Sequence, residues 1–155
     1  MFKKMIVGYD VHGVDVAKEL MAILKKMKIK AVVVEYSGDS SVDYVAITNR
    51  ATKMFEEDSL ADGLILICGT GVGALMLANR YGFVRAVLAD SKQRAYYARR
   101  HENANCLVFA GGYDDGKVKV EPTNNIEEII KAFAQTPFEG ERHKARVDSL
   151  SSVGE

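Results

Sequence analysis

The sequence has no excess of charge of either sign and no long apolar run. Its 155 residues include 21 basic and 21 acidic side chains, so no charged surface favours a nucleic-acid or membrane partner. No apolar stretch approaches the roughly 20 residues that a membrane span needs. The N-terminal segment MFKKMIVGYD holds only a short apolar stretch, which is typical of a first strand rather than of a signal peptide. We therefore expect a cytoplasmic protein.

The sequence is also poor in cysteine, and it has no internal repeat, low-complexity stretch or interdomain linker. Without a secretory signal, Cys68 and Cys106 are expected to be reduced thiols rather than a disulfide. Cys106 lies in the apolar run CLVFAGG and is predicted to be a buried strand residue. The length fits one domain over residues 1–150, followed by a frayed tail at 151–155.

Strand-like and helix-like segments alternate along the chain. Strands are predicted at 5–9, 31–36, 63–67, 84–88 and 105–110, and helices at 14–28, 43–56, 71–80, 91–100 and 126–134. Segments 37–41 and 111–124 are expected to be irregular, and a basic tail follows Pro137. Five β–α alternations predict an α/β fold, a single-domain Rossmann-like three-layer sandwich around a five-stranded parallel sheet.

Residues able to do chemistry follow the ends of predicted strands. Asp10 and His12 come after the first strand, and Cys68 comes after the third. In parallel sheets covered by helices, ligands bind at the carboxyl ends of strands, near the point where the strand order reverses. We therefore expect these residues at one edge of the sheet.

The densest chemistry lies at residues 63–79, GLILICGTGVGALMLAN. An apolar strand leads to Cys68, then to a loop containing Gly69, Gly71 and Gly73, and then to a helix. The glycines allow a tight turn close to a ligand, and the helix N-terminus favours an anion. Beside that positive end, Cys68 is expected to favour its thiolate. A cysteine can also be a small core residue, but the glycine loop favours an anion site with a nucleophile or base.

The same loop also matches the dinucleotide-binding pattern G-x-G-x-x-A over residues 69–74. That fingerprint normally follows the first strand of its unit and has an acidic residue about 20 residues further on. Here the loop follows the third predicted strand, and Asp90 lies beyond another strand. Dinucleotide binding is therefore disfavoured.

The other charged candidates each have two interpretations. His101 either favours the C-terminal end of its helix as a cation or has a functional role, and His12 is similarly ambiguous. Arg142 and Arg146 are spaced to share one helix face. They form either a solvated basic patch or a fork for phosphate or carboxylate.

Three segments together resemble one known family. They are Ile67–Gly73 (ICGTGVG), His101–Asn105 (HENAN) and Phe138–Arg146 (FEGERHKAR), and the Val42-Asp43-Tyr44 triplet also fits. In their order and spacing, the chain resembles ribose-5-phosphate isomerase B and the galactose-6-phosphate isomerase subunits over residues 5–150. The combination is specific, because the ICGTGVG segment alone would only be suggestive.

The resemblance implies interconversion of an aldose phosphate and a ketose phosphate through a cis-enediolate, without metal or organic cofactor. Cys68 would be the base, the N–H groups of residues 69–73 would hold the developing oxyanion, and His101 would open the sugar ring. Further implied catalytic residues are Thr70 and Asp43; implied substrate contacts are Asp10, His12, Tyr44, Gly69, Gly71, Val72, Gly73 and Glu102; implied phosphate contacts are Arg142 and Arg146. A homodimer or homotetramer is implied, with the site at a subunit interface and the C-terminal helix on the partner.

The chain departs from the family pattern at the substrate end. Relatives usually read Asp-His-Ala-Gly after the first strand, and this chain reads Asp-Val-His-Gly at residues 10–13. After the fifth strand, Gly-Ala-Arg is replaced by Gly111-Gly112-Tyr113, and Glu102 replaces an asparagine. We expect the reaction to be retained, with ribose 5-phosphate, a hexose 6-phosphate or a tetrulose phosphate as alternatives. A non-catalytic sugar-phosphate-binding subunit is the other possibility, but the chain keeps both Cys68 and the tail arginines.

Overall fold

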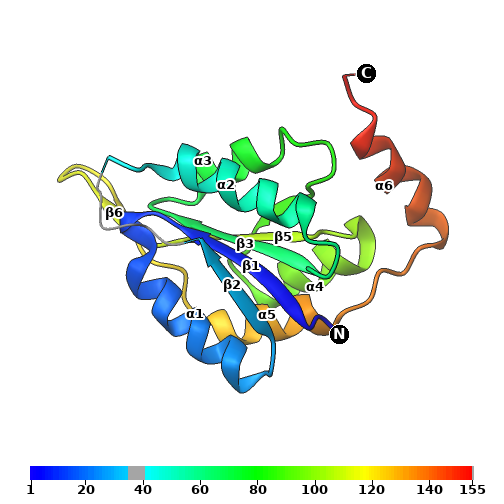
Figure 1. Cartoon of the computed structure of the whole chain (residues 1–155), viewed down its shortest axis with the longest axis horizontal. Coiled ribbons are helices and arrows are strands. Elements are labelled where there is room, and N and C mark those ends of the chain that lie inside the picture. Colours follow the sequence, from blue (N-terminus) through cyan, green and yellow to red (C-terminus); the bar gives the residue numbers. More distant parts are fainter. Residues whose placement is uncertain (35–40, 155) are drawn as a thin grey trace.

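A computed structural model describes residues 1–34 and 41–154, and it is built around a five-stranded parallel sheet (Figure 1). The strands are β1 (Lys4–Tyr9), β2 (Lys30–Val34), β3 (Gly63–Cys68), β4 (Ala86–Leu88) and β5 (Cys106–Ala110). Their order is β2-β1-β3-β5-β4. The predicted α/β three-layer fold with a five-stranded parallel sheet is confirmed. The predicted disulfide-free state also agrees, since both cysteines are free thiols.

Helices cover both faces of the sheet and bury two apolar cores. Helices α1 (Val14–Lys26), α4 (Lys92–Glu102) and α5 (Ile126–Gln135) lie on one face, and α2 (Tyr44–Glu57) and α3 (Val72–Ala78) lie on the other (Figure 1). Every residue of β3 and of β5 is buried. This matches the apolar runs of the sequence, because a strand with helices on both sides needs no polar face.

The direction in which successive strands are added to the sheet reverses at β1, because β2 and β3 lie on opposite sides of it. Helix α1 leads from β1 to β2 on one side, whereas α2 leads to β3 on the other side of β1. The ends of the two strands are adjacent, since Tyr9 is in register with Ile67. Asp10 then donates its backbone N–H to the Ile67 carbonyl at 3.3 Å. The residues that follow β1 and β3 therefore meet at the position where such sheets bind ligands.

Some element boundaries differ from the predictions. Strand β3 includes Cys68, β4 starts only at Ala86, and α4 runs on to Glu102. The expectation that residues 111–124 are irregular was wrong in part, because β6 (Tyr113–Asp114) and β7 (Lys119–Val120) form a short antiparallel hairpin. Most of the expected loop at 37–41 lies outside the described residues, as does the end of the predicted strand at 31–36.

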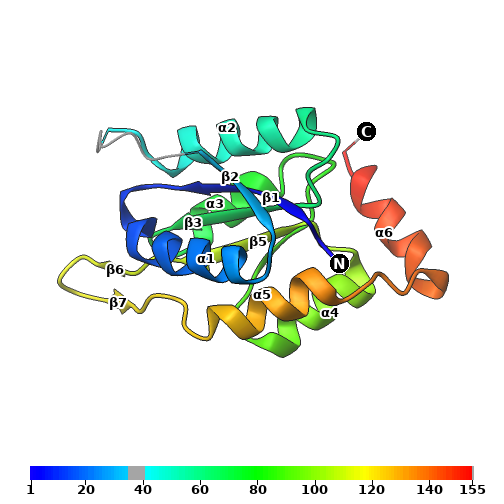
Figure 2. The same cartoon turned by 60° about the horizontal axis from the view of Figure 1, so that its bottom comes forward.

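The C-terminal segment forms an arm beside the sheet layers. It consists of the 3₁₀ turn η2 (Glu141–His143) and helix α6 (Lys144–Ser151). In Figure 2 this arm and the β6–β7 hairpin lie at opposite ends of the molecule. The residue that α6 buries is Val147. Packing of this helix on a partner stays a prediction, as do the domain limits and the frayed tail.

The outer edge of β4 is occupied by a side chain. The Asn79 carboxamide donates to the Ala86 carbonyl at 3.0 Å and accepts from the Ala86 N–H at 2.8 Å. Exposed edges of this kind otherwise offer unpaired backbone groups to other strands. In the described part of the chain, no helix has both the length and the apolar character that crossing a membrane requires.

Candidate active site

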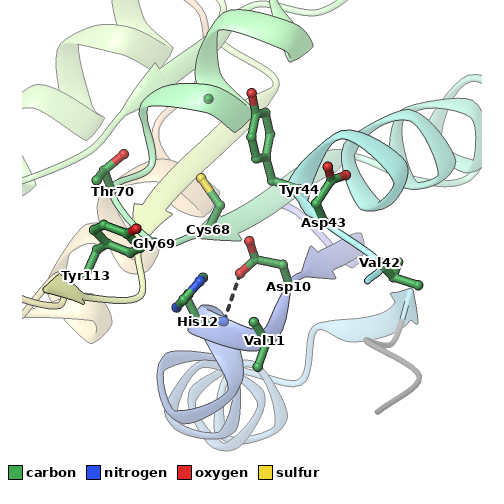
Figure 3. A pocket seen from close by; sticks show the side chains of 11 residues that line it. Asp10, Val11, His12, Val42, Asp43, Tyr44, Cys68, Gly69, Thr70 and Tyr113 are labelled. Carbon is green, nitrogen blue, oxygen red and sulfur yellow. Dashed lines mark hydrogen bonds between the residues drawn. The ribbon is translucent and has the colours of Figure 1, made fainter. Parts of the chain in front are cut away.

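A pocket of about 290 Å³ opens at the carboxyl ends of β1 and β3 (Figure 3). Figure 3 shows Asp10 and Cys68 near its middle, with Tyr44 and Tyr113 on opposite sides. The lining residues are Asp10, Val11, His12, Val42, Asp43, Tyr44, Cys68, Gly69, Thr70, Gly73 and Tyr113. The predicted meeting of Asp10, His12 and Cys68 at one sheet edge is therefore observed.

Asp10 is a buried carboxylate in the wall of this pocket. It is 4% exposed and accepts a hydrogen bond from the His12 N–H at 3.0 Å, at the start of the 3₁₀ turn η1 (Val11–Gly13). Burial raises the pKa of Asp10 above its ordinary value, against the opposing effect of the His12 N–H. The side chain thus holds the turn together and presents an oxygen to the pocket.

Cys68 is more weakly acidic than the sequence suggested. Burial raises the pKa of the Cys68 thiol, and the charge of nearby Asp10 adds to this. The backbone N–H groups of Ala74, Gly71 and Gly73 act in the opposite direction but do not outweigh burial. The expectation that the helix N-terminus favours a thiolate was therefore wrong for this chain taken alone, because desolvation is the larger effect.

The glycine loop brings backbone close to other parts of the pocket. Gly71 has a φ of 79°, which a residue with a side chain rarely adopts. A Cβ on Gly73 would lie 2.6 Å from the Tyr44 ring. The Thr70 hydroxyl accepts from the Val72 N–H at 3.2 Å. Val72 is thus already engaged by Thr70, so the expected row of free N–H donors over residues 69–73 is interrupted at that position.

Asp43 and Tyr44 begin helix α2 at the rim of the pocket. Asp43 is the N-cap and accepts from the N–H groups of Val45 at 3.0 Å and Ala46 at 3.2 Å. This gives Asp43 a structural role beside its predicted role at the sugar. Tyr44 is 38% exposed, so its ring is available to a ligand or a partner.

Tyr113 lines the pocket, a role that the sequence did not predict. The sequence showed only that Tyr113 stands where relatives usually have an arginine. It begins the β6–β7 hairpin and packs edge-on against the His12 ring, with centroids 5.3 Å apart. Its ring also lies over Gly69, where a Cβ would come within 3.1 Å. The Gly-Gly pair before it and the polar hairpin gave no signal that this side chain returns to the pocket.

The remaining predicted residues lie elsewhere in the chain. Among the described residues, the pocket lining does not include Gly71 and Val72 of the glycine loop, nor His101, Glu102, Arg142 or Arg146. His101 sits near the end of α4, just before β5 begins, whereas Cys68 is in register with Ala110 at the far end of β5. At about 3.3 Å per residue, the length of β5 alone separates them by well over 10 Å. Glu102 lines a different pocket, together with Leu150 of α6 and Val153 beyond the end of that helix.

His101 belongs to a second polar cluster with residues of the arm. Its ring stacks on that of His143, with centroids 4.3 Å apart and planes at 11°. Glu139 lies within 3.9 Å of both rings. The ligating atoms of these three residues lie within 4.8 Å of one another, close enough to share a cation. The predicted absence of a metal remains a prediction.

The spacing of the two tail arginines predicted that they share one helix face. In the structure they do not lie in one regular α-helix. Arg142 lies in the 3₁₀ turn η2, and Arg146 lies in α6. Both are exposed. Their guanidinium groups are therefore available at the surface, on the side of the molecule that carries His101.

The model of the family described as Ribose/Galactose Isomerase matches residues 5–150. The chain belongs to this family. The resemblance seen in the sequence is thereby confirmed. The chain is 27% identical to ribose-5-phosphate isomerase B of Escherichia coli, over 97% of this chain and 96% of the relative. It is 30% identical to a galactose-6-phosphate isomerase subunit of Streptococcus pyogenes, over 96% and 98%.

Members of the family with solved structures share the whole fold. The structure of ribose-5-phosphate isomerase B from Mycoplasma genitalium with bound ribulose-5-phosphate aligns with a TM-score of 0.82. The identity is 30%, and the alignment covers 98% of this chain and 96% of that one. The family is one of aldose–ketose isomerases, so the predicted enzyme class is supported at that level.

Proposed function

We propose that this protein interconverts an aldose phosphate and a ketose phosphate of the ribose 5-phosphate and ribulose 5-phosphate type through a cis-enediolate. The observation that carries the proposal is the Cys68 thiol. It lies in the pocket at the strand reversal, where the N–H groups of Gly71, Gly73 and Ala74 act to lower its pKa against the effect of burial. A base beside several backbone donors suits a reaction that moves a proton from one carbon to its neighbour while negative charge develops on oxygen.

The other lining residues have matching roles in this proposal. The Cys68 thiolate takes the proton from one carbon and returns it to the next, so no net oxidation of the sugar phosphate occurs. Thr70 exchanges a proton with the two substrate oxygens, and Asp10 binds a sugar hydroxyl. Their positions in the pocket support these assignments.

Replacement of the base tests the reaction. Cys68→Ala should reduce kcat by about 10²–10⁴-fold and leave the melting temperature and phosphate binding close to wild type. Cys106→Ala is the matched control, because that thiol is fully buried at the start of β5 and does not line the pocket, whereas Cys68 is in register with the last residue of β5. A Cys68→Ala enzyme with wild-type turnover would overturn the assignment of the base.

We further propose that a second copy completes the site, in a two-fold homodimer. Within one chain, Cys68 and His101 lie at opposite ends of the sheet. Both regions also present exposed apolar side chains: Met76 of α3 is 67% exposed, and Tyr97, whose ring lies 5.0 Å from that of His101, is 53% exposed. A two-fold axis would bring the Cys68 pocket of one copy against the His101 cluster of the other.

Mixing two inactive variants tests this arrangement. Cys68→Ala and His101→Asn should each be inactive alone, and co-refolding them in equal amounts should restore about a quarter of wild-type activity. The reason is that each hybrid dimer would then hold one site without either substitution. If both residues acted within one chain, every site would carry a defect and the mixture would stay inactive.

One observation favours a substrate other than ribose 5-phosphate. Tyr113 replaces the arginine expected from the family pattern, and with His12 it forms an aromatic wall in the pocket. Tyr113 lacks the guanidinium group that pairs with phosphate through two hydrogen bonds, so the altered end would suit a sugar phosphate of another length. Turnover of four-, five- and six-carbon aldose phosphates decides this. If ribose 5-phosphate is the best substrate and Tyr113→Phe does not change the ranking, the alternative is wrong.

A further inference from the structure

The cluster around His101 contains one residue whose placement the proposed reaction leaves unexplained. His143 is 5% exposed, although it lies in a tail whose neighbours on both sides, Arg142 and Lys144, are exposed. Its ring lies flat on that of His101. A nearly buried histidine in a charged, solvent-facing segment indicates that contacts with other parts of the chain hold its ring.

The cluster holds the ring of His101 from two sides. On one side, the stacked His143 ring covers its face at 4.3 Å. At its edge, the Glu139 carboxylate lies 3.9 Å from its Nε2 atom, and Arg100 fixes that carboxylate by an ion pair of 2.9 Å. The Tyr97 ring also lies 5.0 Å away, one turn earlier on α4. A catalytic side chain works best when neighbours hold it in one orientation.

His143 also engages one of the arginines expected to bind phosphate. The Arg142 Nε–H donates to the His143 Nε2 atom at 3.3 Å. Because Nε2 accepts this bond, the ring is neutral and carries its proton on Nδ1. Burial lowers the pKa of His143, as do the charges of His101, Arg142 and Arg146, whereas Glu139 raises it. The neutral state drawn from the hydrogen bond agrees with this direction.

We infer that His143 is a positioning residue that orients both the ring of His101 and the guanidinium group of Arg142. The inference deepens the proposed function and rests on it, together with the ring-opening and phosphate-binding roles that the family resemblance implies for those two residues. Its face stacks on the ring-opening histidine, and its Nε2 atom fixes the phosphate-binding arginine.

Two substitutions separate the two contacts. His143→Phe keeps a flat ring against His101 but removes the acceptor for Arg142. We expect KM for the best sugar phosphate and the inhibition constant of inorganic phosphate to rise about tenfold, with kcat little changed. His143→Gln keeps an acceptor but removes the ring. Here we expect kcat to fall about tenfold and the acidic limb of the pH–rate profile to move, with KM little changed.

A merely structural role predicts a different pattern. Loss of packing alone would lower the melting temperature in both variants and change KM and kcat to the same extent in each, which would overturn the inference. Thermal unfolding and light scattering show whether each variant keeps its fold and assembly. The samples contain a chelator, because the ligating atoms of His101, Glu139 and His143 lie within 4.8 Å of one another.

A measurement on the wild-type protein without substrate removes the dependence on the proposed function. The chain has three histidines, so long-range ¹H–¹⁵N spectra resolve each ring, and the His143→Gln spectrum assigns His143. We expect His143 to be neutral at neutral pH, with its proton on Nδ1, because its Nε2 atom accepts from Arg142. A His143 ring that is charged at neutral pH, or protonated on Nε2, would overturn the inference. Should Cys68→Ala instead prove fully active, the proposed reaction fails while the histidine pair stands.

Discussion

Alkylation of Cys68 should accelerate steadily with pH and continue to do so beyond pH 8.5. The reactive species is the thiolate, and burial raises the pKa of this thiol. A cysteine with an ordinary pKa of about 8.5 is roughly 3% ionised at pH 7. Cys68 should be below that fraction, and its rate of reaction with iodoacetamide should rise about tenfold per pH unit as long as the pH is well below its pKa.

Mass spectrometry of the intact protein follows this reaction, and the chain supplies its own controls. Cys106 is fully buried and its pKa is strongly raised, so it should stay unmodified, and a Cys106→Ala protein should give the same curve. Asp10→Asn removes a negative charge that raises the pKa of Cys68, so this variant should react faster at pH 7. Asparagine can still cap the turn at Val11–Gly13. A rate that levels off below pH 8 would refute the reasoning, because it would show that the helix N-terminus outweighs burial.

Three further predictions concern backbone and capping. Asp43→Ala removes the N-cap of α2 and should lower the free energy of unfolding by about 1 kcal/mol, which corresponds to a fall of about 2–4 °C in melting temperature. Asp43→Asn should keep the wild-type melting temperature, so any loss of activity in it reports on the pocket alone. Equal falls in melting temperature in the two variants would contradict the cap. Gly111→Ala places a Cβ 2.1 Å from the His12 carbonyl oxygen, so we expect at least about 2 kcal/mol of destabilisation by chemical denaturation. Gly73→Ala meets only the half-exposed Tyr44 ring and should instead raise KM with little loss of stability; a loss as large as that of Gly111→Ala would argue against this difference.

The fold and the meeting of Asp10, His12 and Cys68 in one pocket were predictable from local patterns. The apolar runs at β3 and β5 indicated strands covered on both faces, and strand ends placed Asp10, His12 and Cys68 at one edge. The protonation of Cys68 was not predictable, because it depends on how much of the sulfur other residues cover. The helix N-terminus can be read from sequence, whereas the desolvation that opposes it cannot.

The contacts of Tyr113 and His143 depend on long-range packing. Tyr113 belongs to a hairpin whose strands are two residues each, too short for any periodicity to indicate. His143 is surrounded by charged residues in a segment that is typical of a solvated surface, and its burial comes from a contact with α4 that lies 42 positions earlier, at His101. Local composition indicates neither contact, since each joins segments far apart in the chain.

The carboxamide of Asn79 has a consequence for how copies of this molecule can join. It donates one hydrogen bond to the Ala86 carbonyl and accepts one from the Ala86 N–H. These are the backbone groups with which a further strand would pair, so the sheet ends at β4. A neighbouring molecule cannot continue the sheet from that side without first displacing the carboxamide. Association through this edge is thereby disfavoured, which leaves the helices, the loops and the β2 edge of the sheet as contact surfaces. The same side chain thus protects the β4 edge from pairing with a strand of another molecule.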